Sequence, residues 1–167
     1  MTGALSPGQA AIVDVVAWAV LGVAIGYVAH RIPTRWLEVD RGPTRLLRAE
    51  QGGRLHERYL AIGAWQRRLP DAGTVFAGGR SKRSLASRRP GDLERLAAET
   101  RRAELTHWAL LAATPAFALW NPWWLTVAMA AYALAANLPC LLAQRYNRAR
   151  LERILARRAD RSARIAS

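Results

Sequence analysis

Two regions of the chain carry almost no charge, and the polar residues are concentrated between and after them. The first, AAIVDVVAWAVLGVAIGYVA at residues 10–29, is long enough to cross the ~30 Å hydrocarbon core of a bilayer as a helix. The second holds two apolar runs, 105–120 and 123–143, joined by NPWW, which combines turn residues with interfacial tryptophans. This pattern predicts three transmembrane helices, one within 10–30 and two forming a helical hairpin within 104–144.

The basic residues indicate the orientation of these helices. All 25 Lys and Arg residues lie within 31–102 or 145–164, and the formal net charge is +13. Because basic segments stay on the cytoplasmic side, the N-terminus is predicted outside, and 31–103 and the tail 145–167 inside. A cleaved signal peptide fits less well, since the first nine residues are uncharged and no A-x-A site follows. The chain is expected to be one multi-pass domain of the inner (cytoplasmic) membrane.

The two cytoplasmic parts show helical periodicity. In RLHERYLAIGAWQRRL, the positions that share one helix face are Leu55, Tyr59, Ile62, Gln66 and Leu69. This spacing predicts an amphipathic helix on the inner leaflet, and the apolar positions of 151–155 predict a second one in the tail. Asp92 is expected to cap a helix that runs unbroken into the second pass. The predicted class is therefore an all-α integral membrane protein with three transmembrane helices and basic amphipathic surface helices on the cytoplasmic side.

Polar residues at the cytoplasmic end of the hairpin could perform chemistry. Glu104 and His107 are three residues apart on one helix, where the carboxylate could orient an imidazole that acts as general base. On the third pass Asn137 and Gln144 share a face with Arg148. If the two faces meet, the catalytic residues of a cleft at the membrane surface would be His107, Glu104, Asn137 and Gln144. The alternative, that these side chains only hydrate a helix end, stays open.

Other kinds of site are less well supported. ELTH offers at most two metal ligands, so no metal site is predicted, and GGRSKRS lacks the spacing of a nucleophile elbow or phosphate loop. Nucleic acid is not expected as a partner, because the basic segments lack an array of stacking aromatic residues. His56 is expected at the protein surface, and Asp14 as a solvated residue at the outer interface. Cys140 is the only cysteine, so an internal disulfide is excluded.

Several strings resemble a known family. ETRRAELTHW is followed, after the apolar hairpin, by YALAANLPCLLAQRYNRARLERIL, and the earlier strings HRIPTRW, EQGG and WQRRLPDAG appear in order. Together they are similar to the bacterial glycosyl-4,4′-diaponeurosporenoate acyltransferases, small membrane enzymes that complete staphyloxanthin-type carotenoids. The resemblance covers nearly all of the chain after the first pass. It implies transfer of a fatty acyl group from an activated thioester to a sugar hydroxyl of a glycosylated carotenoid.

This reaction suits the candidate residues. His107 could take the hydroxyl proton, Glu104 could orient His107, and Asn137 or Gln144 could donate to the oxyanion. No bound cofactor is expected, and the co-substrate would be acyl-CoA or an acyl carrier protein thioester. The residues expected to bind substrate are Arg101, Arg102, Trp65, Asp71, Arg145, Tyr146, Asn147 and Arg148. The four arginines of this set would hold the anionic donor.

Two other functions are compatible with the sequence. A non-catalytic membrane scaffold could organise a lipid or carotenoid pathway through its basic cytoplasmic segment. A small membrane reductase or methyltransferase ranks below both, because the chain has no dinucleotide-binding fingerprint. The expected partners are membrane lipid, a glycosylated carotenoid or similar glycolipid as acceptor, the acyl donor and, in a homo-oligomer, a second copy.

Overall fold

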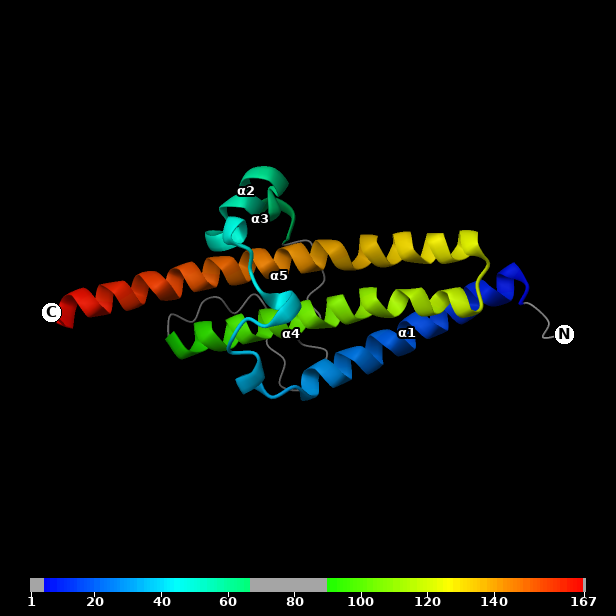
Figure 1. Ribbon diagram of the computed structural model, residues 1–167, viewed down its shortest axis with the longest axis horizontal. Helices are drawn as coiled ribbons and strands as arrows, with labels where there is room; N and C mark the ends of the chain where they lie inside the picture. Colours follow the sequence, from blue (N-terminus) through cyan, green and yellow to red (C-terminus); the bar gives the residue numbers. More distant parts are fainter. Residues whose placement is uncertain (1–4, 67–89, 167) are drawn as a thin grey trace.

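The computed structural model describes residues 5–66 and 90–166, and every regular element in this part of the chain is helical, which confirms the predicted all-α class. The long elements lie side by side (Figure 1) and are α1 (Pro7–Arg31), α4 (Pro90–Ala113), its 3₁₀ continuation η7 (Thr114–Leu119) and α5 (Trp123–Ala166). The short elements between α1 and α4 are η1 (Thr34–Trp36), η2 (Gly42–Thr44), η3 (Arg48–Gly53), α2 (Arg54–Leu60) and α3 (Ile62–Trp65).

Local sequence signals set both ends of α1. Ser6 and Gln9 form a capping box, in which Ser6 N–H donates to Gln9 Oε1 at 2.9 Å and Gln9 N–H donates to Ser6 Oγ at 3.4 Å. Pro7 suits the first turn because its missing N–H would have no helical partner there. The helix ends at Arg31, since Pro33 holds the residue before it in an extended conformation.

The C-terminus of α1 is held by a side chain of α4. Arg102 Nη1 donates to the carbonyl oxygens of Ala29 at 2.5 Å, His30 at 3.1 Å and Ile32 at 2.7 Å. The last carbonyls of a helix have no partner within the helix, and a cation is favourable next to them. Arg102 therefore fixes the end of α1 against the polar half of α4.

The other end of α1 is fastened to the turn between η7 and α5. Asp14 is buried and its Oδ1 accepts from Trp120 Nε1 at 2.8 Å and from Asn121 Nδ2 at 2.8 Å. The expectation that Asp14 is a solvated end residue is wrong, because these two donors from a distant turn cover its carboxylate. As a result the N-terminal part of α1 and the α4–α5 turn lie at the same end of the molecule (Figure 1).

α4 begins in polar sequence and ends in apolar sequence, and its apolar end belongs to the first arm of the predicted hairpin. It runs from Pro90 past His107 without interruption, as predicted, although Asp92 lies in its first turn and not at its cap. The helix changes to 3₁₀ geometry at Thr114, because Pro115 has no N–H to continue the α-helical hydrogen bonds. Asn121 and Pro122 then form the predicted turn.

α5 is one helix of 44 residues, which contradicts the prediction of a separate surface helix in the tail. The reason lies in the composition of 144–166, which is rich in Ala and Arg and contains no Gly or Pro that would end a helix. Pro139 lies inside α5, and the helix continues on both sides of it.

The predicted helix over 54–69 is also interrupted. α2 ends at Leu60, Ala61 adopts a left-handed conformation with φ of 45°, and α3 begins at Ile62. This bend turns Ile62 into a cluster with Ala143 and Tyr146 of α5, where it is fully buried. α2 and α3 therefore pack on α5 (Figure 1), while Leu69 lies outside the described residues.

Two helices of the described chain, α1 and α5, are long and apolar enough to cross a membrane. They correspond to the first and third predicted passes. Both display large apolar side chains on the molecular surface, and examples are Ile12, Val16, Val20 and Val23 of α1 and Val127, Leu134 and Leu138 of α5. The second predicted pass, 105–120, comprises the apolar end of α4 and η7, and the three-pass arrangement stays a prediction.

Candidate functional site

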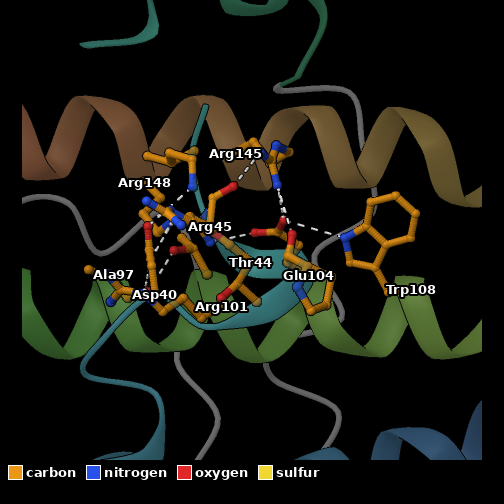
Figure 2. Close-up of polar contacts among 12 residues, drawn as sticks. Asp40, Thr44, Arg45, Ala97, Arg101, Glu104, Trp108, Arg145 and Arg148 are labelled. Carbon is orange, nitrogen blue, oxygen red and sulfur yellow. Dashed lines mark hydrogen bonds and ion pairs between the residues drawn. The ribbon is translucent and has the colours of Figure 1, made fainter. Parts of the chain in front are cut away.

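A buried polar cluster lies between α4 and α5, at the level where α4 changes from charged to apolar sequence (Figure 2). Glu104 of α4 is at its centre and exposes no surface. Its Oε1 accepts from Arg145 Nη1 at 2.5 Å, and its Oε2 accepts from Arg148 Nη1. Trp108 Nε1 approaches Oε1 at 3.5 Å. The carboxylate is therefore neutralised by two guanidinium groups one turn apart on α5.

Every N–H group of Arg145 has an acceptor in the fold. Nε and Nη2 donate to the two carboxylate oxygens of Glu50 at 2.8 and 2.5 Å. Nη1 donates to Glu104 and to the Pro43 carbonyl at 3.1 Å, and Nη2 also donates to the Arg45 carbonyl at 2.9 Å. Since a guanidinium carries five N–H groups, Arg145 has none left for an anionic substrate.

Arg148 and Arg101 are also used within the fold. Arg148 exposes no surface; its Nη2 donates to the Thr44 carbonyl, and its Nε lies 3.5 Å from Asp40 Oδ1. Arg101 donates through Nε to the same Asp40 oxygen at 2.6 Å and through Nη2 to Glu152 Oε1 at 2.9 Å. Together with Arg145, these arginines hold the segment that contains η2 and η3 against the α4–α5 pair (Figure 2).

The cluster continues to a histidine that was expected at the protein surface. His56 of α2 is almost fully buried, and its Nε2 lies 3.3 Å from Glu50 Oε1. Burial lowers the pKa of His56 more than the Glu50 carboxylate raises it, so the neutral imidazole is favoured. Burial opposes ionisation of Glu50, but hydrogen bonds from Arg145 and from the Leu47 N–H hold the pKa of its carboxyl below the ordinary value. The expectation of a surface position for His56 is wrong.

His107 makes its defined contact with the third predicted pass. Its Nδ1 lies 2.8 Å from Asn137 Oδ1, while Asn137 Nδ2 donates to the Ala133 carbonyl at 2.8 Å. The second bond fixes the orientation of the amide, so its oxygen faces the imidazole and Nδ1 carries the proton. The unprotonated nitrogen of the neutral ring is then Nε2, which is the atom that could accept a proton.

Gln144 lies on the same face of α5, seven residues after Asn137. Its side chain is 1% exposed, and Oε1 has no hydrogen-bond partner. A buried amide oxygen without a partner is unfavourable by about 1–3 kcal/mol, which is a reason to look for a ligand or water there. Of the two amides predicted to assist catalysis, Gln144 is thus the one whose oxygen has no partner in the fold.

Six of the predicted site residues lie in two groups. Glu104, Arg101, Arg145 and Arg148 form the charged cluster, and His107 and Asn137 form a pair on the apolar side of it.

Two other predicted residues lie beside α2 and α3. Tyr146 is buried and donates to Glu57 Oε1 at 3.1 Å, and Trp65 Nε1 donates to the Leu60 carbonyl at 2.9 Å. Asn147 is half-buried, and Asp71 lies outside the described residues. In the described part of the chain, no group of three or more His, Cys, Asp or Glu side chains is arranged to hold a metal ion.

Sequence reasoning did not assign a role to Asp40 or to the pair of Glu50 and His56. Glu50 is separated from Arg145 by 95 positions, so no helical spacing links them. The only signal was the string EQGG, which contains Glu50 and the glycine that precedes α2. Gly53 has φ of +73°, and an added Cβ would lie 3.2 Å from Tyr146, so this string fixes the close approach of η3 to α5.

The fold and the cluster define an all-helical protein with two membrane-length helices and a polar site between α4 and α5. The profile of the glycosyl-4,4′-diaponeurosporenoate acyltransferase family matches residues 33–157. A glycosyl-4,4′-diaponeurosporenoate acyltransferase of Staphylococcus haemolyticus is 30% identical over 135 residues, covering 81% of this chain and 78% of that protein. One from Staphylococcus aureus (strain bovine RF122 / ET3-1) is 27% identical over 147 residues, covering 86% and 88%.

The chain therefore belongs to the glycosyl-4,4′-diaponeurosporenoate acyltransferase family and is an acyltransferase. No solved structure matches it.

Proposed function

We propose that this protein transfers a fatty acyl group from a thioester to a sugar hydroxyl of a glycosylated carotenoid or a similar glycolipid at the inner face of the cytoplasmic membrane. The acceptor is suggested by the names of the relatives. The observation that supports the chemistry most directly is the contact of His107 with Asn137, because it leaves Nε2 as the basic atom. The acyl donor would be acyl-CoA or an acyl carrier protein thioester.

In this mechanism the sugar hydroxyl gives its proton to His107 Nε2 while its oxygen attacks the thioester carbonyl carbon. The C–S bond then breaks, the imidazolium returns the proton to the departing thiolate, and the products are an ester and a free thiol. Asn137 is the positioning residue that holds the tautomer. Gln144, which is buried on the same face of α5, would donate from its amide Nε2 to the developing oxyanion, while its Oε1 can only accept a hydrogen bond. Glu104 would act indirectly, because it binds Arg145 and Arg148 and so holds α4 against α5 close to where His107 and Asn137 meet.

The proposed depth of the site agrees with a lipid-like acceptor. Arg102 binds the end of α1, which we place at the inner interface, and His107 follows five residues later, about 7–8 Å further along α4. In the proposed topology α1, the second pass 105–120 and α5 all cross the membrane, with the N-terminus outside. A sugar at headgroup level would reach His107, while its apolar tail stays among the exposed side chains of α1 and α5.

The test is a lipid extract from cells that contain or lack the protein, analysed by mass spectrometry for a species heavier by one fatty acyl residue. His107→Ala should lower product formation by about 10²–10⁴-fold, the usual contribution of a general base. Asn137→Leu should lower it less, because the imidazole remains but is no longer oriented. His30→Ala, at the end of α1, is the matched control and should keep wild-type activity. Each variant is quantified in the membrane fraction.

Two results would contradict the proposal. Full product with His107→Ala at wild-type protein level would remove this residue from the mechanism. If His107→Ala and Glu104→Gln both keep full product formation and pathway enzymes co-purify with the protein, the scaffold function would be favoured over catalysis.

A further inference from the structure

The C-terminal end of α5 extends beyond the rest of the bundle (Figure 1). The last packed position is Leu155, which adds to the cluster of Leu93, Ala97 and Leu151. From Ala156 to Ile165 the side chains are exposed, apart from the half-buried Arg158. Because α5 is one continuous helix, this end follows directly on the part of α5 that is proposed to cross the membrane.

One face of this end is a stripe of arginines. Its members are Arg150, Arg153, Arg157, Arg161 and Arg164. At 100° per residue they fall within about 80° of the helix circumference and extend over about 21 Å. Arg150 stacks on Tyr146 at 5.4 Å, and Arg153 lies 3.6 Å from the position of a Cβ on Gly52, so the stripe passes the start of α2. The internal Arg145 and Arg148 point to other sides of α5.

The distance from the membrane limits what the stripe can bind. If the apolar part of α5 ends at Arg145, Arg157 lies about 18 Å and Arg164 about 28 Å further along the helix. A tilt of 40° would leave Arg157 about 14 Å and Arg164 about 22 Å from the end of the apolar part, and the headgroup layer fills about 5–7 Å of each distance. Charges are screened beyond about 8–10 Å at physiological ionic strength. Headgroups of the same membrane therefore lie out of reach of Arg164 at either tilt and of Arg157 when the helix is upright. Residues 147–167 contain no aromatic side chain to stack on nucleic acid.

We propose that this arginine stripe is the docking surface for an acidic acyl carrier protein that delivers the acyl thioester. The inference rests on the proposed function. The internal arginines cannot perform this task, because Arg145 and Arg148 are saturated or buried within the fold. Five cations spread over about 21 Å match the acidic face of a protein better than the compact phosphates of a free coenzyme A thioester.

The experiment compares two donors on the full-length protein in nanodiscs of neutral phosphatidylcholine. The donors are palmitoyl-acyl carrier protein and palmitoyl-CoA, and the variant is Arg157→Glu combined with Arg161→Glu. The control, Arg35→Glu combined with Arg95→Glu, makes the same change in net charge at two exposed positions elsewhere. Binding of the carrier protein is measured separately by surface plasmon resonance.

The stripe variant should raise KM for palmitoyl-acyl carrier protein at least tenfold without changing kcat, and should leave KM for palmitoyl-CoA unchanged. The control should change neither. Raising the ionic strength from 0.1 to 1 M, which shortens the Debye length from about 10 to about 3 Å, should weaken carrier binding to the wild type but have little effect on the stripe variant.

Several outcomes would overturn the docking proposal. These are equal KM values for the stripe variant and wild type, equal effects of stripe and control variants, or wild-type activity with palmitoyl-CoA and no carrier binding. An effect that occurs only in nanodiscs with phosphatidylglycerol would assign the stripe to lipid headgroups. If the wild type uses neither donor, the proposed acyl transfer fails, and carrier binding still decides the role of the stripe.

Discussion

The most informative perturbation of the buried cluster is Glu104→Gln. The change keeps the size of the side chain and removes its charge, while Arg148, which exposes no surface, stays cationic. Arg145 keeps Glu50 as a partner at 2.5 and 2.8 Å, so the unbalanced charge falls mainly on Arg148. Its remaining acidic neighbours are Asp40 and Glu152, whose oxygens lie 3.5 and 3.9 Å from Nε.

The expected loss follows from the cost of leaving a buried charge without its partner, which is about 3–5 kcal/mol. Because Asp40 and Glu152 partly compensate, we expect the lower end of this range, about 3 kcal/mol. For a chain of this size each kcal/mol moves the unfolding midpoint by about 2–4 °C, so the Tm should fall by about 6–12 °C. Replacing both Glu104 and Arg148 by Met should be less damaging than the sum of the two single changes, because no isolated charge remains.

Thermal unfolding of the purified protein in one detergent, followed by tryptophan fluorescence at a fixed scan rate, measures this shift. The matched control is Glu94→Gln, which removes an exposed carboxylate from the same helix and should change stability by less than about 0.5 kcal/mol. A shift of about 2 °C corresponds to at most about 1 kcal/mol. If Glu104→Gln, like the control, unfolds within about 2 °C of the wild type, the reasoning on the buried charge is refuted.

Two further predictions concern the contact of η3 and α2 with α5. Gly53→Ala should destabilise the protein by about 1–2 kcal/mol in the same unfolding assay, because its φ of +73° and an added Cβ 3.2 Å from Tyr146 are both unfavourable. The control Gly22→Ala adds a Cβ with nothing within 4 Å and should not lower the Tm. Equal effects of the two changes would contradict the strain argument. Stability should fall on acidification below about pH 6.5, because the pKa of His56 is lowered in the folded protein and the unfolded chain therefore binds this proton first. The lowered pKa of Glu50 extends the loss of stability to lower pH. Tm values measured across this range should change less near pH 6 for His56→Gln than for the wild type, and an unchanged profile would argue against a contribution from the buried imidazole.

Periodicity located several parts of the site because they depend on one helix at a time. Glu104 and His107, and Asn137, Gln144 and Arg148, could be placed on common faces from their spacing alone. The same reasoning expected Glu104 to orient His107, whereas Asn137 is the partner of this imidazole across the helix pair. Spacing on one helix cannot specify which side chain of a second helix lies opposite.

The sequence by itself determined the helical class, the apolar segments, the turn at Asn121-Pro122 and the polar side chains at the charged end of the hairpin. Each of these follows from interactions between residues close in the chain, such as proline geometry or an uninterrupted apolar run. Only the tertiary structure decided which acid pairs with which base. Glu50, Asp40 and the carbonyls of η2 reach the α4–α5 pair through contacts across tens of residues, and the free energy of burying these charges depends on that three-dimensional neutralisation.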